Sequence, residues 1–348
     1  MRVVILTQYY PPETGAPQNR LSALAHSLTL AGHEVTVLTA MPHYPAMKIH
    51  EDYRGKWVVE EEVEGVDLLR TWIYARRNKG LITRLLNYFS FVFTSMLWGT
   101  FKLSKHDVLI LESPPLFLAI SARWLCLVKR MKLVTNVSDL WPESAVSLGL
   151  ISNKMMIKAA TFLENGMYRS SQLISGQTKG IVEHISGRFP NKPYVWFPNG
   201  ADLKMFKPQP RDDHWREQFG LRESDILCCY AGILGHAQGL ETIVLAAVQF
   251  RQHIHVQFVL VGDGPMKEEL KQLVNKLGLT NVHFQSSIPR KELIKLLSAV
   301  DISIVPLKNS PLFLGAIPSK IFENLAMEIP VVMGVKGEAY RLFVEEGD

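Results

Sequence analysis

Residues 1–39, MRVVILTQYYPPETGAPQNRLSALAHSLTLAGHEVTVLT, decide the fold class. Residues 1–7 have the apolar run of a buried strand, and residues 8–17 form a loop rich in Pro and Gly. Residues 19–31 have the apolar spacing of an amphipathic helix, and residues 34–39 are a second β-rich run. This order of strand, loop, helix and strand predicts a βαβ unit with parallel strands.

The same alternation continues to the end of the chain, which predicts an α/β protein with two successive Rossmann-like domains. We expect an N-terminal domain over residues 1–198, a linker rich in turn formers over 199–210, and a C-terminal domain over 211–348. Further strands are predicted over residues 66–73, 107–111, 132–137, 172–175, 194–197, 226–231, 256–261, 282–284, 302–306 and 330–333. Further helices are predicted over residues 116–129, 154–168, 240–250, 266–277, 290–298, 319–327 and 338–345.

The composition is that of a globular protein with an uneven charge. Hydrophobic residues are 47% and charged residues 20% of the chain, which excludes a disordered chain or a coiled coil. The net charge is +5, yet residues 1–200 have 22 basic and 15 acidic side chains, and residues 76–132 have ten and two. This predicts an anionic partner for the N-terminal half, with a solvated face as the simpler alternative. Three cysteines without metal-type spacing favour a reducing compartment.

One segment, LITRLLNYFSFVFTSMLWGTF, departs from the alternation; it runs from Leu81 to Phe101 with Arg84 as its only charge. Its length approaches the roughly 20 residues of a spanning helix, but Asn87, Ser90, Thr94, Ser95 and Thr100 weaken that interpretation. We expect a helix that lies in the plane of an anionic membrane surface, with a buried helix covering the sheet as the alternative. The basic residues that flank it are Arg76, Arg77, Lys79, Lys102 and Lys105.

Two glycine-rich segments follow predicted strands. Gly262, Asp263 and Gly264 lie at a strand–helix junction, where backbone N–H groups favour an anion, although a tight turn needs the same residues. Gly232 and Gly235 allow a ligand such as a diphosphate to approach the backbone closely. The chain has no GxxxxGK[ST] motif, which disfavours a P-loop nucleotidase, and no HExxH motif.

A third motif lies near the C-terminal end. Pro318 and Ser319 predict the start of a helix, with Ser319 as N-cap. Lys320 then falls in the first turn, where the helix dipole disfavours a cation, so its position makes more sense beside an anionic ligand. Glu323 lies one turn further on the same face, where a carboxylate can accept two hydrogen bonds from ribose hydroxyls. A surface Lys–Glu pair is the alternative.

Asp139 follows the predicted strand 132–137 within the block SDLWPES. A carboxylate at the carboxyl end of a strand lies where ligands of such sheets bind. Asp139 is therefore a candidate to bind a hydroxyl group or to act as a base, with capping of the following turn as the alternative.

Taken in order, six segments resemble the family 4 glycosyltransferases of the GT-B fold. They are VVILTQYYPPETGAPQNRLSALAHSLTLAGHEVTVLTA, SDLWPES, PNGAD, GILGHAQGLETIVLAA, LVGDGP and PSKIFENLAMEIPVV. The resemblance covers essentially the whole chain, and the order and spacing make it more specific than any single motif. The DLWPES and PSKIFE segments are most similar to the branch that transfers fucosamine in O-antigen or capsular polysaccharide biosynthesis.

The resemblance implies two Rossmann-like domains facing across a cleft, the C-terminal one for a nucleotide sugar and the N-terminal one for the acceptor. Transfer in this family retains the anomeric configuration and generally needs no metal, and the nucleotide-diphosphate sugar is a donor substrate, not a resident cofactor. Catalysis then rests on positioning and on stabilising the charge of the diphosphate. The implied acceptor is a polyprenyl-diphosphate-linked saccharide, which implies a cytoplasmic enzyme at the inner face of the plasma membrane; nucleic acid is not an expected partner.

The resemblance also implies roles for individual residues. Gly15 lies in a loop that faces the diphosphate, and Gly232 and Gly235 mark the phosphate loop of the C-terminal domain. Lys320 is the cation on the phosphate side, and Glu323 binds ribose. The set of expected site residues is completed by Asp139, Gly264, Pro318 and Ser319.

This sequence departs from the family pattern at several positions. The first of two glutamates eight positions apart falls on Gly315, and the usual Arg and Lys after the phosphate-loop glycine fall on Ile233 and Gln238. Ser138 stands where a His is usual. The family continues beyond the position of Asp348 with another strand and helices, so we expect the C-terminal domain to be incomplete here.

Two other functions fit the same motifs. A GT-B-like epimerase acting on a nucleotide sugar would share the cleft but would have little need for a membrane-facing surface. An inactive membrane-associated scaffold fits the expectation of an incomplete C-terminal domain.

Overall fold

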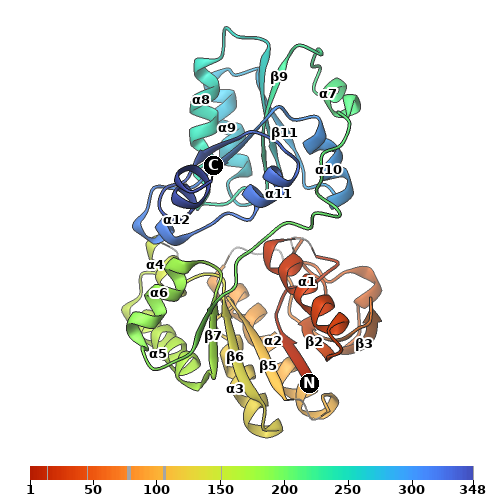
Figure 1. Ribbon diagram of the computed structural model, residues 1–348, viewed down its shortest axis with the longest axis vertical. Coiled ribbons are helices and arrows are strands. Elements are labelled where there is room, and N and C mark those ends of the chain that lie inside the picture. The colour runs from red at the N-terminus through yellow and green to blue at the C-terminus, as the bar shows by residue number, and fades with distance from the viewer. Residues whose placement is uncertain (14, 45, 77–79, 105–106, 150, 348) are drawn as a thin grey trace. The chain divides into compact units, whose positions relative to one another are not determined.

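The computed structural model describes residues 1–13, 15–44, 46–76, 80–104, 107–149 and 151–347. The chain forms two compact units, Met1–Pro198 and Asn199–Asp348, and each has one central sheet (Figure 1). Arg77, Lys79 and Lys105, three of the basic residues expected to flank the apolar segment, lie outside the described residues.

The N-terminal unit has an eight-stranded sheet with the order β3-β4-β2-β1-β5-β6-β7-β8, in which every pair except β3–β4 is parallel. The strand order reverses between β1 and β5, and loops after these two strands lie where ligands of doubly wound sheets bind. The strands are β1 (Arg2–Leu6), β2 (Glu34–Ala40), β3 (Val58–Val63), β4 (Val66–Thr71), β5 (Val108–Ser113), β6 (Lys132–Val137), β7 (Leu173–Gly176) and β8 (Tyr194–Trp196).

The sequence did not predict β3, and its composition gives the reason. Its residues, VVEEEV, are acidic and mostly exposed, as suits an edge strand, so the apolar signal of a buried strand is missing. A tight turn at Glu64 and Gly65, which have φ values of 52° and 76°, joins it to β4 as an antiparallel hairpin.

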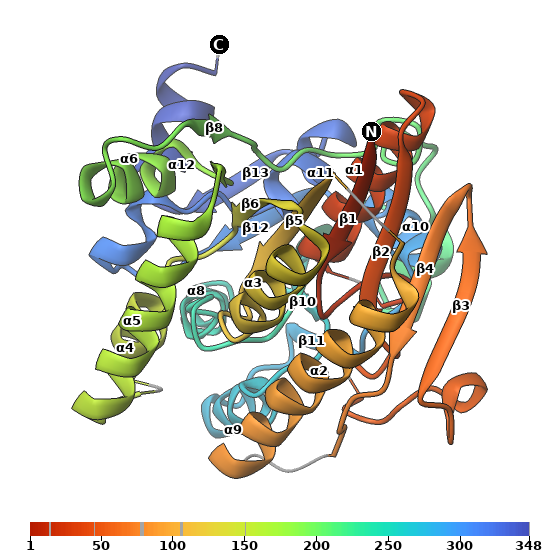
Figure 2. The ribbon, with the colours of Figure 1, turned by 90° about the horizontal axis from the view of Figure 1, so that it is seen from below.

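Helices cover both faces of this sheet over two apolar cores, and α2 and α3 lie side by side (Figure 2). No predicted helix covered α4 or α6; Thr178 caps α6 by accepting a hydrogen bond from the Ile181 amide at 3.2 Å. The helices are α1 (Ala16–Leu30), α2 (Leu81–Lys102), α3 (Leu118–Lys129), α4 (Glu143–Ser147), α5 (Lys154–Ser170) and α6 (Lys179–Arg188), with a 3-10 turn at Glu51–Tyr53.

Helix α2 packs against the unit with a mixed side, on which the apolar Phe91 and Val92 lie beside buried Asn87, Thr94 and Ser95. The Asn87 amide donates to the Tyr74 carbonyl at 2.7 Å, the Thr94 hydroxyl donates to the Trp72 carbonyl at 2.6 Å, and the Ser95 hydroxyl lies 2.8 Å from that of Ser121. Three of the polar residues that weakened a membrane-spanning interpretation therefore join the helix to the segment after β4 and to α3. No helix within the described residues combines the length and the apolar character that crossing a bilayer requires.

The C-terminal unit has a five-stranded parallel sheet with the order β11-β10-β9-β12-β13, which is the doubly wound arrangement with its reversal between β9 and β12. Two apolar cores lie on its faces. The strands are β9 (Ile226–Ala231), β10 (Val256–Val261), β11 (Val282–Gln285), β12 (Ile302–Pro306) and β13 (Val331–Gly334). The helices are α7 (Asp213–Gln218), α8 (Glu241–Gln249), α9 (Lys267–Leu277), α10 (Arg290–Ser298), α11 (Lys320–Ala326) and α12 (Glu338–Tyr340), with further helical turns at Pro311–Gly315 and Arg341–Glu345.

Candidate functional site

Two glycine loops pack backbone to backbone at the carboxyl ends of β9 and β10. The Leu234 amide donates to the Asp263 carbonyl at 3.0 Å. A Cβ on Gly262 would lie 1.9 Å from the Gly232 carbonyl oxygen, and one on Gly264 would lie 2.3 Å from the Leu234 carbonyl oxygen. Only glycine therefore allows this approach, and the interlocked loops form a rigid surface of backbone groups.

Lys320, at the start of α11, lies against this surface. Its Nζ is 3.8 Å from the centroid of the Tyr230 ring, a cation–π contact. Gly232 has a φ of +149°, which favours glycine, and a Cβ there would lie 2.8 Å from the Lys320 Nζ, so the lysine side chain would have to move. The Tyr230 hydroxyl donates to the Ile233 carbonyl at 2.8 Å, which fixes the ring beneath the loop. The structure thus brings together Gly232 and Lys320, two residues that the sequence predicted for one site.

Burial lowers the pKa of Lys320 to about 7, although Glu323 and Cys229 act in the opposite direction. Lys320 is half-buried, and the Tyr230 ring lies beneath its Nζ. Among the described residues, no carboxylate forms an ion pair with that nitrogen within 4.0 Å. A phosphate group near its Nζ would supply the missing negative charge and hold the proton on the amine.

We predict that binding of a nucleoside diphosphate takes up a proton. At about pH 8, an amine with a pKa of about 7 is roughly 90% neutral, so pairing with a diphosphate should take up about 0.9 proton per site. At about pH 6 the uptake by this group should fall to roughly 0.1. Calorimetry in buffers of different ionisation enthalpy measures the uptake, and the Lys320→Met variant should lose the pH 8 uptake. Equal uptake by that variant would contradict the assignment.

Glu323 lies one helical turn after Lys320, as expected, and also pairs with Arg290. The Arg290 Nη2 is 3.5 Å from the Glu323 Oε1, and the Arg290 Cζ lies 4.8 Å from the ring centroid of Phe206. Burial raises the pKa of Glu323, while the neighbouring Arg290 and Lys320 favour its charged form. The arginine therefore positions a carboxylate that keeps acceptor oxygens for a ligand.

The start of α11 is at the predicted position but lacks the expected capping bond. Ser319 stands at the N-cap position, yet it has helical backbone angles, φ −59° and ψ −27°, and its side chain makes no capping hydrogen bond. The helix begins instead with a turn in which the Ile321 amide donates to the Pro318 carbonyl at 3.1 Å. Pro318 fixes the chain direction ahead of Lys320, which is the contribution this segment makes to the site.

Gly235 and Gly264 differ in how strictly they need to be glycine. A Cβ on Gly235 would make only an ordinary contact, 3.5 Å from the Ile233 Cγ2, whereas Gly264 has no room for one. The carboxylate of Asp263, which lies between Gly262 and Gly264, already accepts a hydrogen bond from the Lys267 Nζ at 2.6 Å. Hydrogen bonding to Lys267 and Ser287 outweighs desolvation and lowers the pKa of Asp263, so this carboxylate serves the loop structure.

A pocket of about 300 Å³ adjoins the loops at the ends of β12 and β13. The Lys308 amide, in the pocket wall, donates to the Ala237 carbonyl of the β9 loop at 2.9 Å, which ties the two together. Lys308, Asn309, Ser310 and Lys336 give the pocket a polar and cationic rim over apolar side chains such as Phe313.

In the N-terminal unit, Asp139 follows β6 and is half-buried; burial raises its pKa. Its neighbour Ser138, where the family usually has a histidine, belongs to a buried network. The Arg20 Nη2 lies 2.6 Å from the Glu112 Oε1 and 2.5 Å from the Ser138 Oγ, and Ser138 also donates to Glu112. The Asn136 amide donates to the other Glu112 oxygen at 2.6 Å. This network fixes the chain on which Asp139 stands.

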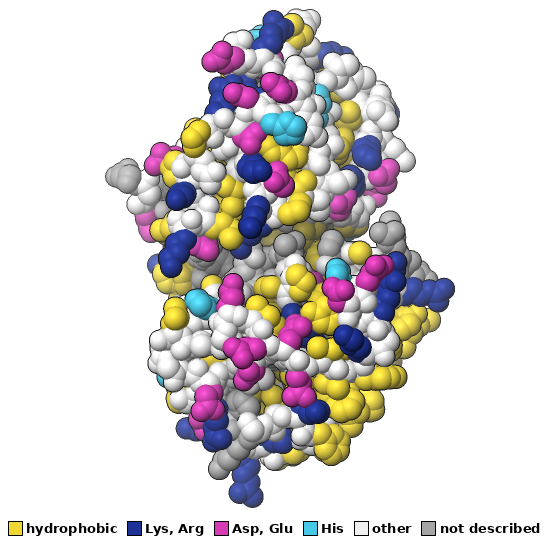
Figure 3. Space-filling view, turned by 90° about the vertical axis from the view of Figure 1, so that its right-hand side faces the viewer, with side chains coloured by type: hydrophobic (Ala, Val, Ile, Leu, Met, Phe, Trp, Pro, Cys, Tyr) yellow, Lys and Arg dark blue, Asp and Glu magenta, His cyan; other side chains and the backbone are white. Residues whose placement is uncertain are grey.

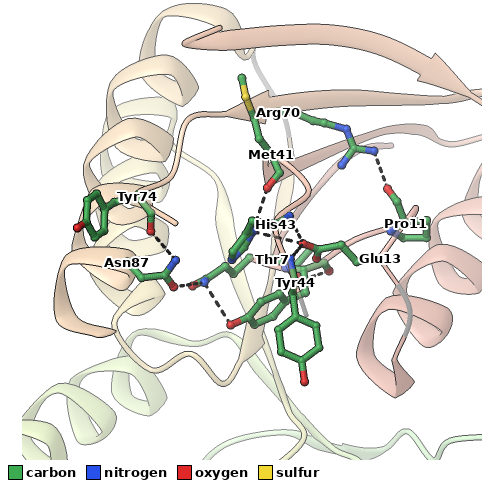
Figure 4. Close-up of polar contacts among 11 residues, drawn as sticks. Thr7, Pro11, Glu13, Met41, His43, Tyr44, Arg70, Tyr74 and Asn87 are labelled. Atoms are coloured by element: carbon green, nitrogen blue, oxygen red, sulfur yellow. Dashed lines mark hydrogen bonds and ion pairs between the residues drawn. The ribbon is translucent and has the colours of Figure 1, made fainter. Parts of the chain in front are cut away.

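Gly15 precedes α1 in extended backbone, and a Cβ there would lie 2.5 Å from the Gln18 Oε1. The neighbouring Glu13 is 7% exposed, and its Oε1 accepts from the backbone amides of His43 and Tyr44, each at 2.7 Å (Figure 4). Hydrogen bonds to the β2 loop therefore anchor the segment that carries Gly15. Among the described residues, no three His, Cys, Asp or Glu side chains gather as a metal site.

Comparison with known proteins identifies the family. A family model described as glycosyl transferase 4-like domain matches residues 15–200, more than half of the chain. The chain belongs to this glycosyltransferase family. A second model, glycosyl transferases group 1, matches residues 211–348, so the two matches follow the two units.

Relatives of this family member include "Putative colanic acid biosynthesis glycosyl transferase WcaI" of Escherichia coli, which is 26% identical over 98% of this chain and 84% of its own length. "Uncharacterized glycosyltransferase MJ1607" of Methanocaldococcus jannaschii is 23% identical over 99% of this chain and 83% of its own length.

Solved structures show that this family member has the GT-B fold. Sucrose-phosphate synthase of Thermosynechococcus elongatus superposes with a TM-score of 0.72 at 17% identity, covering 99% of this chain and 83% of its own. Anabaena HepE, in complex with UDP and glucose, superposes with a TM-score of 0.65 at 18% identity, covering 98% of this chain and 83% of its own. WaaG, a glycosyltransferase involved in lipopolysaccharide biosynthesis, superposes with a TM-score of 0.65 at 17% identity, covering 98% of this chain and 83% of its own.

Sequence reasoning missed two residues that the structure places at the site. Arg290 begins α10 as Lys320 begins α11, so the same unfavourable helix dipole could have singled it out. Tyr230 gives no such signal, because its contact with Lys320 joins residues that lie 90 positions apart in the chain.

Proposed function

We propose that this protein is a retaining glycosyltransferase that moves a sugar from a nucleotide-diphosphate sugar to a lipid-linked saccharide in cell-surface polysaccharide biosynthesis. The observation that carries the proposal is Lys320, a cation with a lowered pKa held over Tyr230 at 3.8 Å beside two interlocked glycine loops. Such a site favours a diphosphate over a neutral ligand. The relative named for colanic acid biosynthesis and the HepE complex with UDP and glucose support the same assignment.

In this proposal the residues of the C-terminal unit stabilise the leaving diphosphate. Lys320 pairs with its charge, and backbone groups at Gly232, Gly235 and Gly264 lie close to its oxygens. Fixed cations and dipoles in a partly dry site stabilise developing charge strongly, because they need no reorganisation during the reaction. The proposed reaction therefore needs no metal.

The N-terminal unit is proposed to hold the acceptor. Asp139 stands on the braced loop after β6 and is proposed to accept a hydrogen bond from an acceptor hydroxyl. Gly15, in the segment anchored by Glu13, is proposed to face the diphosphate. The donor is proposed to carry a hexosyl or N-acetylhexosaminyl group. The DLWPES and PSKIFE segments support this proposal, because they are most similar to the fucosamine-transferring branch.

Glu323 gives a prediction about the ribose. We expect Glu323→Ala to weaken nucleoside diphosphate binding about 10- to 100-fold, since hydrogen bonds to a carboxylate contribute roughly 1.5–3 kcal/mol. Calorimetry measures the loss, and Glu292→Ala is the control because that glutamate is half-buried like Glu323 and pairs only with Lys295 in the described contacts of its side chain. A 2′,3′-dideoxy nucleotide lacks the two ribose hydroxyls. It therefore distinguishes the loss of hydrogen bonds to the ribose from the indirect effect of losing the Arg290–Glu323 pair. Wild type and variant should bind it equally, and a preserved difference would contradict the ribose role.

The membrane proposal rests on α2. Phe93 is 64% and Phe101 74% exposed, and the other large apolar residues of the same helix side are exposed as well. Figure 3 shows hydrophobic side chains gathered along one edge of the N-terminal unit, with Lys and Arg nearby. We call this side the α2 strip: it consists of Ile82, Leu86, Phe89, Phe93, Leu97 and Phe101. A helix whose outer side carries six exposed large apolar residues suits the interface of a bilayer, here proposed as the inner face of the plasma membrane.

Vesicle binding tests this surface. We predict that Arg76→Ser with Arg84→Ser lowers sedimentation with vesicles that contain an anionic lipid, because each basic residue near such a surface contributes about 1 kcal/mol. The matched control, Lys271→Ser with Lys276→Ser, removes the same charge from α9 of the C-terminal unit. Sedimentation unchanged by the first pair, or lowered equally by both, would remove the membrane proposal.

A donor panel tests the proposed function. Nucleotide sugars of the common bases are screened for a rise in melting temperature, since only a ligand that binds the folded state stabilises it by mass action. The sugar of the stabilising donor is then followed by NMR in the absence of an acceptor. We expect one or a few donors to stabilise the protein and their sugar configuration to stay unchanged. Epimerisation would favour an epimerase, and no stabilisation by any donor would favour a scaffold.

A further inference from the structure

An aromatic pocket in the N-terminal unit has no role in the reaction as described so far. It has a volume of about 170 Å³ and lies after β1, β5 and β6, at the sheet edge where ligands of doubly wound sheets bind. Its lining is almost entirely aromatic and proline carbon: Tyr9, Tyr88, Pro114, Pro115, Leu116, Phe117 and Trp141.

The rings of this pocket continue to the protein surface. Phe117 lies 6.4 Å from the Trp141 ring centroid on one side and 5.8 Å from that of Tyr88 on the other. It also lies 4.8 Å from the ring of Phe89, which is 44% exposed and belongs to the α2 strip. An unbroken series of aromatic contacts therefore leads from the exposed strip into the pocket.

Buried polar groups hold the wall of the pocket in place and do not line it. The Gln8 amide donates to the Tyr9 hydroxyl at 3.3 Å and to the Asn87 carbonyl oxygen at 2.9 Å, which joins the β1 loop to α2. The His43 ring stacks on Tyr9 with centroids 5.7 Å apart, and its Nδ1 lies 2.9 Å from the Met41 carbonyl (Figure 4). Tyr9, one of the lining residues of the pocket, is thus preorganised.

We propose that this pocket binds an isoprene unit of the lipid-linked acceptor; the inference rests on the proposed function and adds the substrate part that the N-terminal unit recognises. At roughly 30 Å³ per water-sized group, 170 Å³ accommodates about five or six such groups, the size of one five-carbon unit. A sugar ring suits it less, because its hydroxyls would be desolvated and only the two tyrosine hydroxyls lie among the lining side chains as oxygen partners. The contact from Phe117 to the exposed Phe89 gives the rest of the lipid a path along the α2 strip.

Binding of farnesyl diphosphate, a soluble prenyl diphosphate, tests the pocket by titration of intrinsic tryptophan fluorescence and by calorimetry. We expect Phe117→Ala to weaken this binding about tenfold and Phe117→Leu to restore most of it, because burial of apolar surface drives the contact. Phe162→Ala is the matched control, since it removes an exposed ring of α5 that lies outside both the pocket and the α2 strip. Tyr88→Ala is a second truncation should Phe117→Ala fail to fold by circular dichroism.

Inorganic diphosphate and a methyl glycoside complete the test. Neither should displace farnesyl diphosphate from the pocket, and inorganic diphosphate should bind wild type and the Phe117 variants equally. Equal farnesyl diphosphate affinity in wild type, Phe117→Ala and Tyr88→Ala, or displacement by the glycoside, would overturn the proposal. If farnesyl diphosphate fails to bind while sugar transfer to a lipid extract succeeds, the pocket assignment alone is wrong. If both fail, the lipid-linked acceptor of the proposed function is wrong as well.

Discussion

The Lys320→Met variant should lose about 100- to 1,000-fold in kcat/KM for sugar transfer, the cost typical of removing one group that stabilises charge in a transition state. The methionine keeps the unbranched chain over the Tyr230 ring, so packing is retained and the charge is removed. Steady-state kinetics with the donor found by the panel measure the effect.

The control for this variant is Lys271→Met on α9, a partly exposed lysine whose Nζ lies 3.3 Å from the Glu268 Oε1. It should stay within about twofold of wild type, as surface substitutions usually do. If Lys320→Met and Lys271→Met have the same activity, Lys320 does not stabilise the diphosphate. A loss confined to KM, with kcat unchanged, would show that Lys320 binds the donor equally in the ground state and the transition state.

The Gly262→Ala variant should destabilise the C-terminal unit by about 3 kcal/mol and abolish nucleotide binding. Its Cβ would lie 1.9 Å from the Gly232 carbonyl oxygen, so the two loops would have to separate. Overpacking costs roughly 1–3 kcal/mol, and the positive φ of +137° adds strain of about 1 kcal/mol or more. Chemical denaturation and calorimetric titration measure the two effects.

The Gly278→Ala variant is the control that distinguishes the steric clash expected in Gly262→Ala from the cost of a positive φ. Gly278 has a φ of +62°, and a Cβ there meets no atom within 4 Å, so only the backbone cost of about 1–2 kcal/mol remains. This variant should keep nucleotide binding. Equal destabilisation by the two substitutions, with binding intact in both, would show that the loop approach at Gly262 is not required for the site.

The strands that positioned the site could be predicted because parallel strands are buried on both faces and therefore read as apolar runs. β9 and β10 match their predicted ranges, 226–231 and 256–261. The acidic edge strand β3 carried no such signal. Helix α2 was predicted in place and extent, but its sequence could not tell which side faces the sheet, since the choice depends on hydrogen bonds from Thr94 and Ser95 to distant segments.

The candidate site was predictable where the reason was local. Lys320 and Glu323 lie one turn apart, and their spacing alone placed them on one side of α11. Tyr230 and the aromatic pocket were not predicted, because they form from residues far apart in the sequence that meet only when the sheet assembles. The roles assigned to Asp139 and Gly15 stay predictions.

Transfer of a radiolabelled sugar from the stabilising donor to a bacterial lipid extract tests the central claim most directly. The account predicts label in the organic phase with wild-type protein, a 100-fold or greater loss with Lys320→Met, and no loss with Lys271→Met. Label that never enters the lipid phase, or that enters it equally with Lys320→Met, would contradict it.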